Sequence, residues 1–83
     1  METVFYLYIL ECADETLYTG ITVDLKRRVN EHNSSKLASK YTRVRRPVKV
    51  VYSKKFKNRS LASKEESRIK KLSREEKQEI IYG

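Results

Sequence analysis

The sequence of 83 residues has one cysteine and no long apolar stretch. The single thiol, Cys12, cannot form an internal disulfide, and a structural zinc site usually takes four Cys or His ligands, so neither cross-link is expected. The longest uncharged apolar run, Val4 to Leu10, is far shorter than the roughly 18 residues of a membrane span. A basic start followed by a long apolar segment is missing too, and we therefore expect a cytoplasmic protein without a leader.

The chain is also short. Because domains usually contain about 100 to 200 residues, its length predicts a single domain over residues 1–83. Hydrophobic residues make up 39% of the sequence, which is enough for one modest core. A domain of this size buries only about two-thirds of the surface that its unfolded chain exposes, so we expect marginal stability.

Basic residues are absent from the first 25 positions, where five acidic residues give a net charge of −5. Residues 26–59, by contrast, contain thirteen basic residues and one acidic residue, which gives +12. A basic segment of this kind, in a chain of net charge +8, is typical of proteins that neutralise phosphate groups. The charge therefore favours a nucleic acid partner, and the alternative is a solvated surface that keeps the protein soluble.

Short runs of β-branched and aromatic residues predict three strands. Residues 4–10 are apolar throughout, as in a central strand buried on both faces, and residues 17–22 should pair with them as an antiparallel hairpin. Residues 48–53 predict the third strand, with an extension to Phe56. Gly20 lies inside the second strand, where a glycine marks either a β-bulge or a close approach of backbone to ligand.

A first pair of helices is expected between the second and third strands. Asp24 can cap a helix that runs through Asn33 and places Arg28 and His32, four residues apart, on one solvent-facing edge. Residues 34–47 are rich in Ser and basic residues, which favours a short helix and then an exposed loop. We expect this segment to be the main docking surface.

Two more helices are expected in the last third of the chain. Ser60 can cap the first of them. Its apolar stripe consists of Leu61, Ala62, Ile69 and Leu72. Ser73 and Glu76 match the capping box, in which a Ser and a Glu three positions later satisfy each other's backbone donors, so the final helix begins there.

The spacing of a few polar residues suggests a functional site. Tyr8 and Tyr18 lie ten residues apart on the paired strands, and Arg28 follows Tyr18 by ten on the next helix, so a phosphate can be held among them. Each residue also has an ordinary structural interpretation. The tyrosines can be strand aromatics, Arg28 a solvated cation, and His32 a partner of the helix dipole. Their combination with Gly20 favours the site.

With this spacing, the sequence resembles the GIY-YIG nuclease superfamily, and most closely its small single-domain bacterial members. The likeness covers nearly the whole chain, through Tyr8-Ile9, Tyr18-Thr19-Gly20, residues 24–28, His32-Asn33, residues 40–43, Arg46-Pro47, Val51-Tyr52, Glu66 and residues 69–73. The resemblance implies an α/β (α+β) fold, with a three-stranded antiparallel sheet flanked by helices in the order β-β-α-(α)-β-α-α. It also implies divalent-metal-dependent hydrolysis of a nucleic acid strand.

Roles are carried over residue by residue from this resemblance. Tyr8 and Tyr18 match the tyrosines of the two motifs, and Gly20 matches the glycine of the second. Arg28 matches the arginine that contacts the scissile phosphate. We assign the general base to Tyr18, and His32, at a position often held by His or Tyr, is the alternative proton relay.

The resemblance further implies that Glu66 is the single carboxylate that binds Mg²⁺ or Mn²⁺, since these ions keep several waters and need few protein ligands. Helical spacing alone puts Glu65 nearer the centre of the apolar stripe, so only the resemblance selects Glu66. Residues expected to contact nucleic acid are Gly20, Arg27, Lys36, Lys40, Arg43, Arg45 and Arg46.

Two positions depart from the family pattern. Tyr6 replaces the glycine of the first motif, and Ile21 stands where some relatives have a lysine that helps to activate the phenol. The main hypothesis is an endonuclease that acts on DNA or on structured nucleic acid, with DNA favoured over RNA. The alternatives are a non-catalytic nucleic-acid-binding module on the same scaffold and a protein-interaction subunit.

Overall fold

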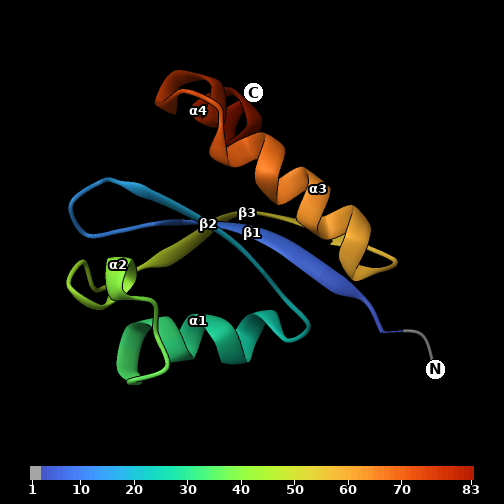
Figure 1. Cartoon of the computed structure of the whole chain (residues 1–83). Helices are drawn as coiled ribbons and strands as arrows, with labels where there is room; N and C mark the ends of the chain where they lie inside the picture. Colours follow the sequence, from blue (N-terminus) through green and yellow to red (C-terminus); the bar gives the residue numbers. More distant parts are fainter. Residues whose placement is uncertain (1–2) are drawn as a thin grey trace.

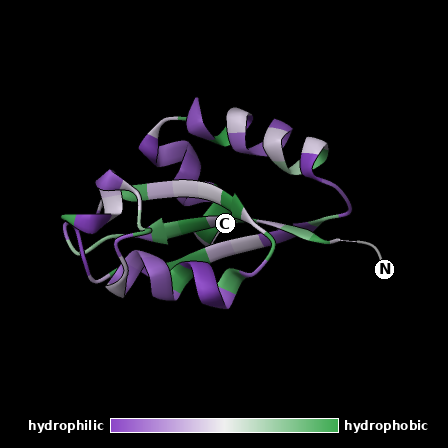
Figure 2. Ribbon diagram, turned by 60° about the horizontal axis from the view of Figure 1, so that its bottom comes forward, coloured by the Kyte–Doolittle hydropathy of each residue, from purple (hydrophilic) through white to green (hydrophobic). Residues whose placement is uncertain are grey.

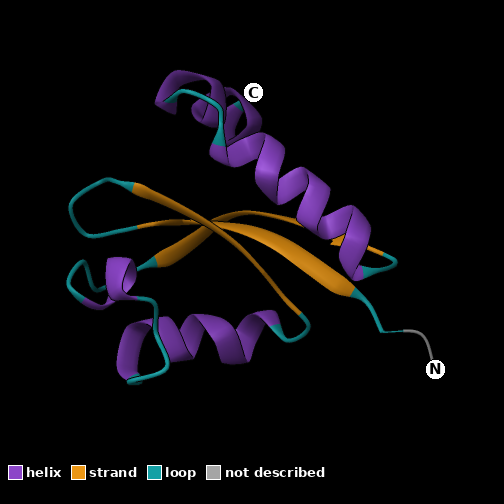
Figure 3. Cartoon of the chain, viewed as in Figure 1, coloured by secondary structure: helices purple, strands orange, loops and turns teal. Residues whose placement is uncertain are grey.

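A computed structural model describes residues 3–83, which form a three-stranded sheet between two layers of helices (Figure 1). In chain order the elements are β1 (Phe5–Glu11), β2 (Leu17–Thr22), α1 (Leu25–Ser34), α2 (Lys40–Arg43), β3 (Lys49–Phe56), α3 (Arg59–Lys70) and α4 (Arg74–Tyr82). Figure 3 shows α1 and α2 on one side of the strands and α3 and α4 on the other. The predicted α+β class and element order are confirmed.

The sheet has the order β2-β1-β3, and both neighbours of β1 are antiparallel to it. The central strand predicted over residues 4–10 is therefore confirmed. Its side chains alternate between two small cores, because successive residues of a strand face opposite sides. Tyr8 and Leu10 pack with Leu25 and Val29 of α1. Leu7 and Ile9 pack on the opposite face with Ile69 of α3.

Figure 2 shows the most hydrophobic residues gathered in the strands, while the helices carry many hydrophilic residues. This distribution agrees with a core that lies along both faces of β1. Among residues 3–83, no helix has the length and apolar character that crossing a membrane requires.

The predicted start of α3 is wrong by two residues. Asn58, and not Ser60, caps the helix, because the Asn58 side chain accepts a hydrogen bond from the Leu61 backbone N–H. The predicted apolar stripe is correct for Ala62 and Ile69, which are fully buried, but Leu61 is exposed. The capping box that begins α4 is confirmed.

Candidate active site

Strand pairing places Tyr8 of β1 directly opposite Gly20 of β2. A Cβ atom at position 20 would lie 2.6 Å from the Tyr8 hydroxyl oxygen and 2.8 Å from its Cζ. The register between the two strands is continuous at this point, and the φ of Gly20 is not positive, so the glycine forms no bulge. Gly20 is buried and leaves room for the phenol, and of the two predicted alternatives the bulge is therefore wrong.

The Tyr8 hydroxyl is hydrogen-bonded to the side chain of His32 in α1, with 3.0 Å between the hydroxyl oxygen and Nε2. The other ring nitrogen, Nδ1, lies 2.7 Å from Oγ1 of Thr42 in α2. Tyr8, His32 and Thr42 are all at most 1% exposed. The prediction of a solvent-facing His32 is therefore wrong, because α2 and β1 cover this part of α1.

Burial dominates the pKa values of both rings. It lowers the pKa of His32 to about 4, with help from the Arg28 and Arg46 guanidinium groups and against the opposing charge of Glu31. Burial, together with nearby Tyr18, raises the pKa of Tyr8 to about 12, although the adjacent Arg28 favours the phenolate. At neutral pH the imidazole is therefore uncharged and the phenol keeps its proton.

Arg28 of α1 is held in place from two sides. Its Nη1 donates to Oε1 of Glu31 at 2.9 Å and to the backbone carbonyl of Leu37 at 2.8 Å. The side chain is 26% exposed, so the guanidinium lies beside the buried Tyr8 hydroxyl and still has access to solvent. Such a group can donate hydrogen bonds to a phosphate without first having to be ordered.

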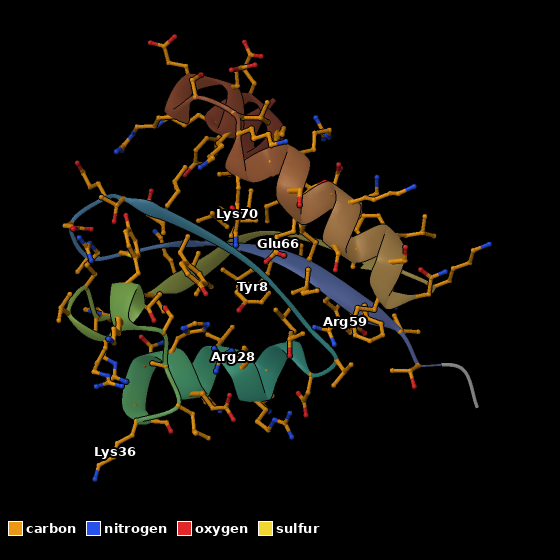
Figure 4. The ribbon with its side chains drawn as sticks, in the orientation of Figure 1. Tyr8, Arg28, Lys36, Arg59, Glu66 and Lys70 are labelled. Carbon is orange, nitrogen blue, oxygen red and sulfur yellow. The ribbon has the colours of Figure 1, made fainter. Side chains whose placement is uncertain are left out.

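Glu66 lies on the face of α3 that covers the sheet, four residues after buried Ala62 and three before buried Ile69. Its negative charge acts on Tyr8, whose pKa it raises. Figure 4 shows Glu66, Tyr8 and Arg28 between α3 and α1, with Lys70 close to Glu66. The Lys70 Nζ lies 3.3 Å from Oε2 of Glu66. Sequence reasoning missed this lysine, and its spacing of four residues from Glu66 is the available signal.

Glu65 has different surroundings, although its side chain is as buried as that of Glu66. Both of its oxygens accept hydrogen bonds from Arg68, and Lys54 of β3 is the other cation that lowers its pKa. Helical spacing places Glu65 nearer the centre of the apolar stripe, but the two side chains differ in their partners rather than in their burial. Glu65 is influenced by Lys54 of β3, whereas Glu66 is the carboxylate of α3 whose charge acts on Tyr8.

Tyr18 contributes an aromatic wall beside this cluster. Its ring stacks on Tyr41 with 5.9 Å between centroids and meets His32 edge-on at 5.2 Å. The Arg45 guanidinium covers the Tyr41 ring at 3.9 Å. Unlike Tyr8, Tyr18 is only half-buried. Tyr18 therefore lies next to the candidate site, but the hydrogen bond to His32 belongs to Tyr8.

Three of the predicted nucleic-acid contacts bind the protein itself. Arg43 donates to the carbonyl of Lys36, Arg45 to Asp14 and the Tyr41 carbonyl, and Arg46 to the carbonyls of His32 and Ser35. Arg45 and Arg46 are half-buried, so the expectation of a fully exposed docking loop is wrong for these two. The sequence pattern could not reveal this, because Arg45 pairs with the distant Asp14 carboxylate and Arg46 donates to backbone carbonyls at the end of α1.

The remaining predicted cations are Arg27, Lys36 and Lys40, and all three are exposed. Arg27 lies 3.8 Å from Glu31, a distance at which an exposed pair contributes little. These side chains remain available to a polyanion.

The described residues contain no cluster of three or more His, Cys, Asp and Glu side chains that could enclose a metal ion. One carboxylate beside Tyr8 still fits Mg²⁺ or Mn²⁺, which commonly bind through one or two carboxylates, several waters and substrate phosphates. If such an ion binds, Glu66 is the residue that would hold it.

Comparison with known proteins agrees with this arrangement. Residues 4–79 match the model of the GIY-YIG catalytic domain. The UPF0213 protein of Syntrophus aciditrophicus is 53% identical over 76 residues, which cover 92% of this chain and 87% of that protein. The UPF0213 protein of Haloquadratum walsbyi is 49% identical over 80 residues, which cover 96% of this chain and 89% of that protein.

Two solution NMR structures are similar as well. The UPF0213 protein of Bacillus halodurans is 40% identical with a TM-score of 0.61, over 94% of this chain and 82% of that one. A protein of E. faecalis is 39% identical with a TM-score of 0.65, over 96% and 86%. With the matched fold, the paired tyrosines and the family model over residues 4–79, this chain belongs to the GIY-YIG family.

Proposed function

We propose that the protein is a metal-dependent endonuclease that hydrolyses phosphodiester bonds in DNA. The observation that carries this proposal is the set of groups around the Tyr8 hydroxyl. His32 is hydrogen-bonded to it, the Arg28 guanidinium lies beside it, and the charge of Glu66 acts on it. A cation, a carboxylate and a phenol coupled to a base are the groups that phosphodiester hydrolysis needs.

Each group has a role that follows from its surroundings. Arg28 donates to the non-bridging phosphate oxygens, where negative charge increases in the transition state. Glu66 would hold Mg²⁺ or Mn²⁺, which supplies positive charge near the phosphate and the leaving oxygen. In the unliganded protein Lys70 neutralises Glu66, so metal binding competes with this ion pair.

The sequence suggests Tyr18 as the general base, and we propose Tyr8 instead as the group that takes the proton of the attacking water, which is supported by its hydrogen bond to His32. A phenol with a pKa of about 12 supplies almost no phenolate at neutral pH. Tyr8 must therefore lose its own proton as it gains the one from water, and the hydrogen-bonded Nε2 of His32 is positioned to receive it. We expect Tyr8→Phe to abolish cleavage and Tyr18→Phe to reduce it less.

The experiment uses supercoiled plasmid, branched DNA and structured RNA, each with Mg²⁺, Mn²⁺ or EDTA. We compare the wild type with Glu66→Gln, which keeps the shape of the side chain but removes its charge. Glu65→Gln is the matched control, because it lies on the same helix but is engaged by Arg68. We expect the cleavage rate of Glu66→Gln to be at least about 100-fold lower than that of the wild type, and the rate of Glu65→Gln to be unchanged. Equal rates for the two variants would contradict the site.

A second candidate is a nucleic-acid-binding module without turnover. It is favoured by the internal pairing of the site, in which Arg28 binds Glu31 and Glu66 binds Lys70. Salt-sensitive binding without cleavage in any metal would support this alternative. The RNA arm tests the assignment to DNA, since preferential cleavage of RNA would overturn it.

A further inference from the structure

The hydroxyl of Thr42 is fully buried and has three hydrogen-bonding atoms around it. Oγ1 lies 2.7 Å from Nδ1 of His32, 3.3 Å from the backbone carbonyl oxygen of Ser39 and 3.1 Å from Oγ of Ser39. Ser39 is the N-cap of α2, and its Oγ also accepts from the Thr42 backbone N–H. The position of Thr42 relative to His32 is therefore set by the first turn of α2.

Counting protons assigns the tautomer of His32. The Thr42 hydroxyl donates to the Ser39 carbonyl oxygen at 3.3 Å, and this oxygen also accepts from the Arg43 backbone N–H at 3.0 Å. With the Thr42 proton directed there, Oγ1 accepts from Nδ1–H of His32 at 2.7 Å. A neutral imidazole with its proton on Nδ1 has a bare Nε2, which accepts the hydrogen bond of the Tyr8 hydroxyl.

The opposite tautomer satisfies fewer groups. With the proton on Nε2, Thr42 would donate to Nδ1 and turn its lone pairs toward the Ser39 carbonyl. Tyr8 would then face two donors, His32 and Arg28, and its own proton would point to neither. An unmatched polar group is costly in buried surroundings, so this pattern of hydrogen bonds favours the Nδ1–H form.

We propose that Thr42, supported by Ser39, is a positioning residue that holds His32 as its Nδ1–H tautomer and so keeps Nε2 ready for the Tyr8 proton. The tautomer is a property of the protein alone. Its effect on catalysis rests on the proposed function.

In the reaction, the water oxygen bonds to phosphorus while one water proton moves to the Tyr8 oxygen and the Tyr8 proton moves to Nε2. The bond from phosphorus to the leaving oxygen breaks. The leaving oxygen takes a proton from solvent, and Nε2 gives its proton back to solvent through Tyr8, so that one water is consumed and His32 is neutral again. His32 in the opposite tautomer has no free Nε2 to accept this proton.

The first test is the tautomer in the absence of nucleic acid and metal. His32 is the single histidine of the chain, so two-bond ¹H–¹⁵N correlation spectra of the imidazole are unambiguous. We expect a protonated Nδ1 and an unprotonated Nε2 in the wild type at pH 7. A protonated Nε2 would overturn the proposal without any variant being made.

The second test removes the hydroxyl. Thr42→Val preserves shape, Thr42→Ser preserves the hydroxyl, and Thr19→Val is a matched control at a buried threonine whose hydroxyl has no partner among the described residues. We expect the Nε2–H form to become populated in Thr42→Val only. An unchanged tautomer in a folded Thr42→Val, as judged by its amide spectrum, would overturn the proposal. If Thr42→Val does not fold, the wild-type spectrum still decides, because a protonated Nε2 there overturns the proposal.

The third test is the rate of DNA cleavage. We expect kcat to fall about tenfold or more in Thr42→Val, with KM unchanged, and to recover in Thr42→Ser. A changed tautomer with normal kcat would overturn the catalytic part. If the wild type shows the Nδ1–H form but cleaves nothing in any metal, the proposed function fails and the tautomer assignment stands. If the wild type cleaves DNA but neither the tautomer nor kcat changes in Thr42→Val, the proposed role of Thr42 fails and the proposed function stands.

Discussion

At the residue scale, the contact between Gly20 and Tyr8 fixes how the phenol lies. A methyl group at position 20 would meet the ring and hydroxyl of Tyr8 at distances that no Cβ tolerates. The ring must then move, and its hydrogen bond to His32 is the interaction that it would lose. The backbone conformation of Gly20 is open to any residue, so the effect of a substitution is steric.

We therefore expect Gly20→Ala to lower the free energy of unfolding by about 1–3 kcal/mol, as overpacking of a core does. Urea denaturation measures this loss. In a Tyr8→Phe background the same change should cost less, because the closest atom, the hydroxyl oxygen, is gone. Equal costs in both backgrounds would show that the phenol is not what Gly20 accommodates.

Also at the residue scale, the low pKa of His32 makes stability depend on pH. The unfolded chain binds this proton near pH 6.5 and the folded protein only near pH 4, so the unfolded state binds more protons between these values. The contribution of His32 to the free energy of unfolding is therefore fully present above pH 6.5 and is lost as the pH falls toward 4.

We expect the free energy of unfolding to fall by about 2 kcal/mol between pH 7 and pH 5 from this group alone. Denaturation at several pH values measures it, and His32→Gln should remove most of the slope. An NMR titration of the His32 ring provides the direct check. A midpoint near the ordinary value of 6.5 would contradict the burial that the structure shows.

At the element scale, two side chains hold α1 to the segment that leads into β3. The Asn33 amide exchanges two hydrogen bonds with the backbone of Val48, through Nδ2 to the carbonyl at 3.0 Å and from the backbone N–H to Oδ1 at 2.7 Å. Arg46 donates to the carbonyls of His32 and Ser35 at the end of α1, each at 2.6 Å. These carbonyls lack partners within the helix, so Arg46 completes its C-terminus.

Arg46→Lys keeps the charge but cannot span two carbonyls with a planar fork. We expect it to lower the free energy of unfolding by about 1–2 kcal/mol, because charge-assisted hydrogen bonds to half-buried groups are lost. Arg43→Lys is the control, since Arg43 is exposed and donates to a single carbonyl. Thermal denaturation compares the two variants. A larger loss for Arg43→Lys would refute the structural role of Arg46.

At the scale of the whole molecule, the basic side chains of residues 26–59 fall into two groups: those that bind other parts of the protein and those that stay exposed. Arg45 and Arg46 are engaged by the protein, whereas Lys36 and Lys40 are exposed and make no ion pair with the described residues. A charge count along the sequence therefore overstates the number of groups that can neutralise phosphates. The salt dependence of binding reports the true number.

For duplex DNA, each phosphate contact contributes about 0.9 to the slope of log K against log salt concentration. We expect the double variant Lys36→Ala, Lys40→Ala to reduce this slope by about 2. The control variant Lys71→Ala, Lys77→Ala changes the charge equally outside residues 26–59 and should leave the slope nearly unchanged. Fluorescence anisotropy at several salt concentrations measures both slopes. Equal reductions would show that the slope follows net charge rather than contacts made by Lys36 and Lys40.

The sequence by itself determined those features that depend on neighbours along the chain. The hairpin, the cap at Asp24 and the capping box of Ser73 and Glu76 follow from side-chain alternation and from hydrogen bonds that span three residues. The motif tyrosines and Gly20 were likewise visible as a pattern. Only the tertiary structure decided how His32, Arg46, Glu65 and Glu66 are used. The partners of His32 lie 24 and 10 residues away, in Tyr8 and Thr42. Burial and hydrogen bonding among such distant groups arise when the sheet brings its two helical layers together, so no local pattern contains them.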